Sequence, residues 1–442
     1  MEQVEVDARM LAGTGARSGI FRRLVLRQLS GMDRGHMRIV LPEGTVVELG
    51  DRTAEHHAMV RVVREEFFRK CVLFGDVGFG EAYVDGDWET PGITDVIAWF
   101  LMNVDRAPGV SGSRRRSAGL NVLRVINRVG HLLRDNTPRG SRRNIAEHYD
   151  LSNDFFARVL DPGMTYSCAC FADPAFTLEQ AQTEKYDRLC RRLGLAPGHR
   201  VLEIGSGWGG FAVHAAGRYG CRVTSISVSR EQVDYARRRV REQGLGDRVE
   251  IRLQDYRTVT GSFDRIVSIE MLEAVGHRHM ETFFARCHEA LAQDGLMGLQ
   301  VIVAPDARYD ELRRGVDWIQ KHVFPGSLLP SIARINRAVN RTGDMSLHDL
   351  LDLGPHYART LRQWRTNFNR NREGMGKLGA DERFVRTWNY YLSYCEAAFA
   401  MRNISVVQMI YTRPNNAALG RIPYRTGPGE AIEPAGGERI SL

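Results

Sequence analysis

A glycine-rich segment at residues 201–210 is the first stretch whose residue types suggest chemistry. It reads VLEIGSGWGG, an apolar run followed by glycines at alternate positions. A strand that leads through such a turn into a helix lets the backbone approach a ligand closely, because glycine has no side chain in the way. The segment lacks the later glycine of the dinucleotide fingerprint GxGxxG and the Lys-Ser/Thr pair of a P-loop. We therefore predict a nucleotide-type ligand that is held by another kind of turn.

An acidic residue, Glu203, precedes the first of these glycines. This form of the turn looks like the one that binds S-adenosylmethionine in methyltransferases. We predict that Glu203, Gly205 and Gly207 contact this methyl donor.

The ends of the next two predicted strands offer further contacts for the donor. Many nucleotide-binding folds place an acid at the second strand end to hold the ribose hydroxyls. No acid stands at that position in this chain, so we expect hydroxyl and amide side chains to bind the ribose instead. At the third strand end, Asp255 is expected to accept a hydrogen bond from the adenine amine and Tyr256 to cover the adenine ring. Alternatively, residues 254–256 form an ordinary turn that caps a helix. The predicted contacts are Ser227, Val228, Gln232, Gln254, Asp255 and Tyr256.

Alternating strands and helices surround these motifs from about residue 144 onward. Strands are predicted at 199–204, 222–226, 249–253, 263–268 and 295–303, with helices at 209–219 and 230–242. A repeated β/α succession indicates a mostly parallel sheet covered by helices. We predict an α/β fold with a doubly wound sheet, and we expect the long insertions within residues 305–400 to roof an apolar channel.

The N-terminal third is organised differently. Apolar and polar residues alternate over 37–41 and 45–49 around Pro42-Glu43-Gly44, which predicts a hairpin. Residues 36–104 are interpreted as a small α+β domain and residues 1–35 as a mobile or loosely helical arm. The tail after residue 414 is rich in glycine and proline and is expected to be disordered.

Arginine is concentrated between the two predicted domains, at residues 105–143, where ten arginines face only two acids. Such a segment attracts an anionic surface, either lipid or nucleic acid. Residues 106–143 contain no Phe, Tyr or Trp, although RNA-binding segments usually add stacking aromatics. An amphipathic helix predicted at 117–134 either packs on the main domain or contacts a membrane.

Composition narrows the class of protein further. The 442 residues carry a net charge of +8, and their seven cysteines form no CxxC pair. This usage argues against a disulfide framework or structural zinc, so no metal is predicted. There is no apolar run long enough to span a bilayer and no basic stretch followed by an apolar core at the first residues, so a cytoplasmic location is expected.

Several ordered motifs between about residue 60 and residue 413 together resemble one family, the cyclopropane fatty acyl phospholipid synthases and mycolic acid methyltransferases. These motifs are GEAYVDGDWE at 80–89, HYDLSNDFF at 148–156, MTYSC at 164–168, EIGSGWGG at 203–210, QDYR at 254–257, EAVG at 273–276, FPG at 324–326 with LPS at 329–331, and WNYYL at 388–392. The N-terminal domain points to the phospholipid-acting branch, and residues 36–104 are then expected to bind lipid.

The resemblance implies a class I methyltransferase that adds a one-carbon unit across the double bond of an unsaturated phospholipid acyl chain. Methyl transfer leaves a carbocation, and a bound bicarbonate then removes a proton so that the cyclopropane ring closes. Tyr166 and Ser167 join the donor site by the same resemblance. The residues expected to act in catalysis or to hold bicarbonate are Cys168, Glu273, Gln300, Ile302 and Tyr357.

Two positions depart from the family pattern, because His is expected where Gln300 and Ala274 stand. Glutamine can donate a hydrogen bond but does not carry a proton at neutral pH. This leaves the product open between a cyclopropane and a methylene- or methyl-branched chain. Taken alone, Cys168 and Tyr357 also suit a packed core, and Glu270 and Glu273 suit helix caps.

The enzyme is expected at the inner face of the membrane, held peripherally on anionic phospholipid, without nucleic acid, and as a possible homodimer. A nucleic-acid-modifying methyltransferase and a non-catalytic lipid-binding protein are the alternatives from other classes.

Overall fold

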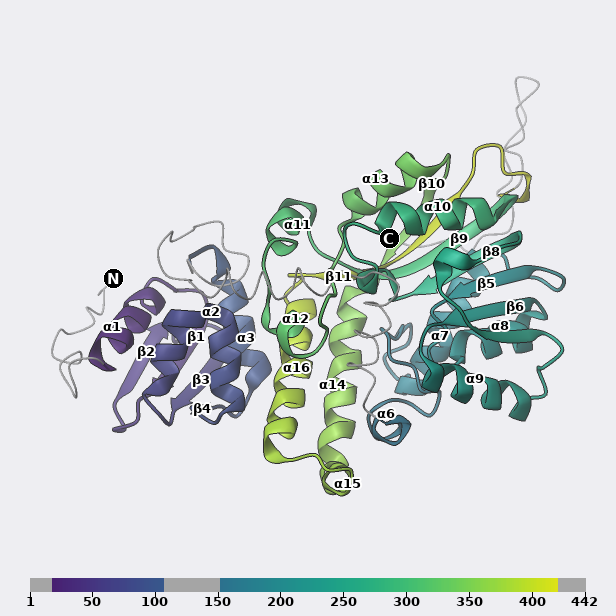
Figure 1. Cartoon of the computed structure of the whole chain (residues 1–442). Helices are drawn as coiled ribbons and strands as arrows, with labels where there is room; N and C mark the ends of the chain where they lie inside the picture. Colours follow the sequence, from purple (N-terminus) through teal and green to yellow (C-terminus); the bar gives the residue numbers. More distant parts are fainter. Residues whose placement is uncertain (1–17, 107–151, 420–442) are drawn as a thin grey trace.

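The computed structural model describes residues 18–106 and 152–419. The arginine-rich linker predicted at 105–143 lies outside the described residues apart from its first two positions, as do residues 1–17 of the predicted arm and residues 420–442 of the predicted tail. Figure 1 shows two units of structure with a long helical pair between them.

The N-terminal domain is built on a four-stranded sheet in the order β2-β1-β3-β4. The hairpin is confirmed, because β1 (His36–Val40) pairs antiparallel with β2 (Val46–Gly50). The third strand, β3 (His57–Val62), pairs parallel with β1 and antiparallel with β4 (Trp88–Glu89). The remaining elements are α2 (Glu66–Val84), α3 (Ile93–Met102) and the short helix η2 (Val104–Arg106).

Within the arm predicted to be mobile or loosely helical, residues 18–29 form a regular helix, α1 (Ser18–Leu29). Val25, Leu26 and Leu29 are buried on one face of this helix, which packs on α2. This spacing is that of a helix with one apolar face. The N-terminal domain therefore begins at α1 and not at residue 36.

A seven-stranded sheet in the order β10-β11-β9-β8-β5-β6-β7 forms the second domain. Its strands β5 to β9 run parallel, and β11 and β10 are added antiparallel at one edge. The predicted α/β sheet is thus confirmed. The strands are β5 (Arg200–Ile204), β6 (Arg222–Ser227), β7 (Val249–Leu253), β8 (Phe263–Ile269), β9 (Leu291–Val303), β10 (Ser346–Asp352) and β11 (Ser405–Thr412).

Helices cover this sheet and connect its strands. Strand β5 leads into α8 (Gly210–Tyr219) and β6 into α9 (Arg230–Glu242), close to the predicted bounds. The sheet is further accompanied by α6 (Asn153–Val159), α7 (Leu178–Arg192), η3 (Tyr256–Thr258), η4 (Leu272–Ala274), α10 (Met280–Ala290), α13 (Ile332–Thr342) and η5 (Ala417–Leu419).

The predicted insertions within residues 305–400 form the structure between the two sheets. The long helices α14 (Gly354–Arg370) and α16 (Glu382–Ala400) pack side by side, with α15 (Arg372–Lys377) between them in sequence (Figure 1). Of the shorter helices, α11 (Asp306–Leu312) contacts α13 and α12 (Trp318–His322) contacts α2, and α16 contacts both α2 and α3.

Polar contacts also join the N-terminal domain to α16 and α12. Arg386 donates hydrogen bonds to the carbonyl oxygens of Tyr83, at 2.7 Å, and Trp88, at 3.1 Å. Lys321 pairs with Glu81 at 2.6 Å. These contacts join the N-terminal domain to the second domain. No helix among residues 18–106 and 152–419 is long and apolar enough to cross a bilayer.

Candidate active site

The glycine-rich turn follows β5 and forms one wall of the site. Gly205, Gly207 and Gly209 adopt positive φ angles of 101°, 49° and 83°. A side chain is strained in this region of backbone space, and a Cβ atom on Gly209 would also lie 3.0 Å from the Cβ of Ala236. The turn therefore needs glycine to bring α8 in close while its backbone faces the cavity.

The carboxyl ends of the parallel strands meet at the same edge, which is where an open α/β sheet binds its ligand. At the end of β6, the hydroxyl of Ser227 donates to Oε1 of Gln232 at 3.0 Å. At the end of β7, Asp255 caps η3 by accepting from the amide of Arg257 at 2.9 Å. Tyr256 packs edge-on against Phe283 with 5.3 Å between ring centroids.

All residues predicted to contact the methyl donor line one cavity of about 940 Å³. Because these side chains come from three strand ends and from the loop before α7, the structure brings together what the sequence spreads over 91 positions. They are Tyr166, Ser167, Glu203, Gly205, Gly207, Ser227, Val228, Gln232, Gln254, Asp255 and Tyr256.

The same cavity extends from the donor turn into the N-terminal domain. Helix α2 is kinked at Gly75, which has φ 59° and ψ −132°, and residues on both sides of the kink line the cavity. This apolar end of the cavity was not predicted in detail. Its lining residues from the N-terminal domain include Leu24, Leu29, Phe67, Val72, Phe79 and Phe100.

Glu270, directly after β8, lines the same cavity. Its backbone has a positive φ of 49°, uncommon for a residue with a side chain. Its carboxylate accepts three hydrogen bonds, from the hydroxyl of Tyr357 at 2.6 Å, from Nε2 of Gln300 at 2.8 Å and from the amide of Cys168 at 2.8 Å. Burial raises the pKa of Glu270, while these three donors favour its ionised form.

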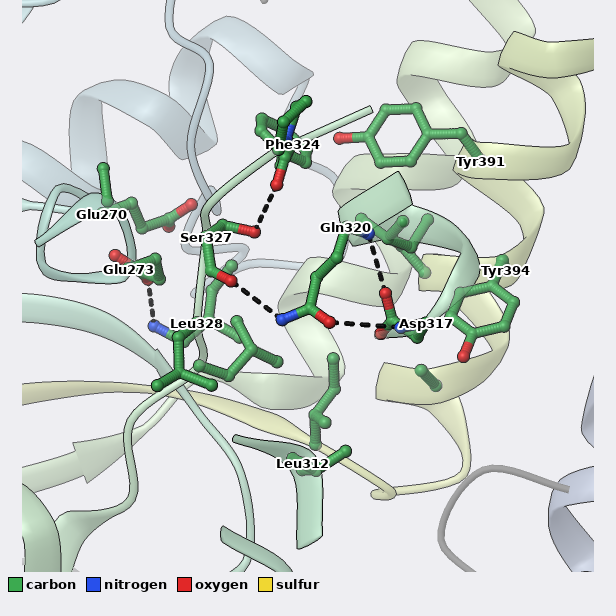
Figure 2. A pocket seen from close by; sticks show the side chains of 18 of the residues that line it. Glu270, Glu273, Leu312, Asp317, Gln320, Phe324, Ser327, Leu328, Tyr391 and Tyr394 are labelled. Atoms are coloured by element: carbon green, nitrogen blue, oxygen red, sulfur yellow. Dashed lines mark hydrogen bonds between the residues drawn. The ribbon is translucent and has the colours of Figure 1, made fainter. Parts of the chain in front are cut away.

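Glu273, in η4, lies close to Glu270 and lines the same cavity (Figure 2). Its Oε1 accepts from the amide of Ile302 at 2.6 Å, and its Oε2 is buried without a hydrogen-bond partner among the described residues. Burial, and then the negative charge of Glu270, raise the pKa of Glu273 to about 8. Two neighbouring carboxyl groups in a buried site do not ionise together readily. Glu270 accepts more hydrogen bonds, which favour its ionised form, whereas a pKa of about 8 favours the protonated form of Glu273 at neutral pH.

Two of the predicted catalytic residues do not line the cavity. The side chain of Cys168 is fully buried, with its thiol 3.8 Å from the carbonyl oxygen of Leu353, and only its backbone amide reaches Glu270. Burial raises the pKa of this thiol well above its usual value. Gln300 lies behind Glu270, and its Oε1 accepts from Gln408 at 3.0 Å. Both residues therefore position Glu270 without facing the cavity.

The predicted bicarbonate does not fit this arrangement. Three of the groups expected to hold it, on Cys168, Gln300 and Tyr357, already donate to Glu270, and the amide of Ile302 donates to Glu273. The carboxylate of Glu270 takes the place in which a separate anion was expected. From the sequence, Glu270 was interpreted only as a helix cap. The signal that could have pointed to it was the pair of glutamates three positions apart at a strand end.

This fold and site define a class I methyltransferase that uses S-adenosylmethionine, since five parallel strands carry the glycine turn and the donor-lining residues at one edge. Residues 136–409 match the family model described as mycolic acid cyclopropane synthetase, and the chain belongs to this family of lipid-modifying enzymes.

Relatives of known name cover most of the chain. The tuberculostearic acid methyltransferase of Mycobacterium tuberculosis is 38% identical over 90% of this chain and 92% of its own. The cyclopropane-fatty-acyl-phospholipid synthase of Escherichia coli K12 is 36% identical over 80% of this chain and 88% of its own. The solved cyclopropane synthase of M. tuberculosis is 31% identical, with a TM-score of 0.57 over 62% of this chain and 98% of that one. The solved mycolic acid cyclopropane synthase complexed with SAH has the same identity, TM-score and coverage of both chains.

Proposed function

We propose that this enzyme transfers the methyl group of S-adenosylmethionine to the double bond of an unsaturated phospholipid acyl chain and closes a cyclopropane ring. The observation that supports this most directly is one cavity whose lining includes the glycine-rich turn, the carboxylate of Glu270 and apolar residues of the N-terminal domain. An acyl chain in the apolar end would place an alkene carbon between the donor and this carboxylate.

The donor supplies an electrophilic sulfonium methyl group, and the alkene supplies the electron pair of the new C–C bond. The C–S bond breaks, the demethylated donor leaves, and a carbocation forms on the neighbouring chain carbon. The negative charge of Glu270 and the ring face of Tyr357 stabilise that cation. Glu270 then accepts a proton from the added methyl group, and the C–H electron pair closes the three-membered ring.

Glu270 performs the role for which bicarbonate was predicted. It is a carboxylate with the same kind of donors around it, and it is part of the chain. Gln300 donates to one of its two oxygens and Tyr357 to the other, which supports a fixed position during proton transfer.

A second product is favoured by one observation, the similarity to a relative named tuberculostearic acid methyltransferase. If a 1,2-hydride shift first moves the cation to the methyl-bearing carbon and Glu270 then takes a proton from the added methyl group, the product is a methylene-branched isomer of the cyclopropane. Loss of a chain proton would instead give a methyl-branched alkene. A saturated methyl branch would require a reductant in addition.

The substrate is proposed to reach the cavity from an anionic bilayer that the enzyme contacts peripherally. The apolar end of the cavity opens in the N-terminal domain, where Leu24 of α1 is 42% exposed and also lines the cavity. Arginines at 114–116 and beyond add charge suited to anionic lipid. Vesicle binding that is unaffected by salt and by anionic lipid would contradict this part of the proposal.

The test is an incubation with methyl-labelled donor and vesicles of mono-unsaturated anionic phospholipid, followed by NMR of the recovered acyl chains. High-field ring protons would establish the cyclopropane, whereas labelled olefinic methylene signals would establish the branched product. Product mass would not separate these isomers. Absence of label in lipid, with label in added RNA, would overturn the proposed substrate class.

A further inference from the structure

Lys185 of α7 is a buried cation for which the proposed reaction has no role. It has no exposed surface and does not line the cavity. Its Nζ donates to the hydroxyl oxygen of Ser167 at 2.6 Å and lies 4.2 Å from the ring centroid of Tyr186. Burying an ammonium group is costly unless it is compensated. Its hydrogen-bond partner here is a neutral hydroxyl, not a carboxylate, which calls for an explanation.

The direction of this hydrogen bond determines what Ser167 offers to the cavity. An ammonium group can only donate, so the hydroxyl oxygen of Ser167 must accept from Lys185. The hydroxyl proton of Ser167 is then free to point away from Lys185, and Ser167 lines the cavity together with Tyr166. The backbone is also fixed, because Nε2 of Gln182 donates to the carbonyl oxygen of Ser167 at 2.8 Å.

We propose that Lys185 is a positioning residue that orients the hydroxyl of Ser167 to donate to the carboxylate of S-adenosylmethionine. A hydroxyl donor with a cation behind it suits an anionic group and not the donor's ammonium group, which can itself only donate. The adenosine end is assigned to the ends of β6 and β7, around Ser227 and Asp255, so the amino-acid end lies toward β5 and Ser167.

Acidic groups on several elements lie near Lys185, and their negative charges oppose the effect of burial on its pKa. They are Asp161 in the segment after α6, Glu203 on β5 and Glu270 after β8, with the thiol of Cys168 also close. Burial nevertheless lowers the pKa of Lys185 to about 8. Above this pH the neutral amine can accept from Ser167, which turns the hydroxyl proton away from the cavity. Donor affinity should therefore fall as the pH rises through about 8.

Glu203 complicates this pH dependence, because burial raises its pKa to about 8 as well. Its ionisation would add negative charge near the bound carboxylate and would weaken binding in the same direction. A lysine variant is therefore needed to separate the two groups.

The experiment measures dissociation constants by calorimetry for the full chain without lipid, so the result does not depend on the proposed acyl-chain chemistry. The ligands are S-adenosylmethionine and its decarboxylated analogue. Lys185→Met and Ser167→Ala should each weaken binding of the intact donor by about tenfold, in line with loss of one charge-assisted contact. Neither should alter binding of the analogue, and the double variant should be no weaker than Ser167→Ala alone.

Equal losses for both ligands, or additive losses in the double variant, would overturn the proposal and leave Lys185 a packing residue. If Lys185→Met does not fold, the wild-type chain and Ser167→Ala are compared at pH 7 and pH 9. The intact donor should then show a larger pH-dependent loss in the wild-type chain than in Ser167→Ala, and an identical loss in both would equally overturn it. At pH 9, Lys185→Arg should recover part of the donor affinity that the wild-type chain loses between pH 7 and pH 9, because arginine stays charged.

Discussion

The hydroxyl of Tyr357 donates a hydrogen bond of 2.6 Å to Oε2 of Glu270, and this contact joins helix α14 to the end of strand β8. The inserted helical pair thus supplies part of the polar shell around the carboxylate at the centre of the cavity. Four experiments follow from this arrangement.

Replacement of the central carboxylate should stop product formation while donor binding persists. Glu270→Gln removes the negative charge and the proton acceptor, so kcat should fall by about 10²–10⁴-fold, the usual contribution of a general base. The matched control is Glu273→Gln, whose amide resembles a protonated acid and should keep activity within about threefold at pH 7. Equal losses in the two variants would contradict the separate roles of Glu270 and Glu273.

The acidic limb of the pH–rate profile should move when one donor to Glu270 is lost. Tyr357→Phe removes a hydrogen bond that favours the ionised carboxylate, so the pKa of Glu270 should rise. Since the base must be ionised, the acidic limb of kcat should shift to higher pH, by about one unit. Steady-state rates between pH 5 and pH 9 measure this shift. An unshifted acidic limb would show that a group other than Glu270 titrates in it.

Activity should not depend on added bicarbonate. The groups expected to hold that ion are engaged by Glu270 and Glu273, so rates in degassed, bicarbonate-free buffer should equal those with bicarbonate. In the Glu270→Gly variant, which opens this position, added bicarbonate or formate should restore part of the rate. A wild-type enzyme that loses activity without bicarbonate would show that the ion, and not Glu270, is the base.

Stability should respond to pH through the second glutamate. The folded-state pKa of Glu273 is raised from 4.5 to about 8, so the folded chain holds this proton more tightly than the unfolded chain, and its contribution to stability is lost as the pH rises through about 8. Glu273→Gln avoids the buried charge and should gain on the order of 2–4 kcal/mol relative to wild type between pH 6 and pH 9. Denaturant unfolding at both pH values measures this; a constant difference would contradict it.

The channel itself is open to a separate steric test. Val72 lines the apolar end of the cavity in the N-terminal domain, so Val72→Trp should lower kcat/KM for vesicle lipid by at least about tenfold, since misplacing the reacting chain is costly. Donor affinity should be unchanged. Val63→Trp is the control, because Val63 is 42% exposed and does not line the cavity. Equal effects of the two variants would argue against an acyl path through this domain.

Much of this protein follows from its sequence alone. Helix 230–242 and strand 249–253 were predicted with the bounds they have, and the residues predicted at the ends of three strands to contact the donor line one cavity. Strand alternation, helix periodicity and glycine turns are local properties that neighbouring residues determine. Parallel strands then bring their carboxyl ends to one edge, so local patterns also predicted the donor site.

Only the tertiary structure decided the centre of the site. The groups around Glu270 come from positions 168, 300 and 357, and Lys185 reaches Ser167 from a neighbouring helix. The apolar end of the cavity likewise depends on how α1 and α2 pack in the N-terminal domain. Burial, hydrogen-bond geometry and the resulting charge states depend on distances between segments far apart in the chain, and residue types and spacing do not encode those distances until the chain has folded.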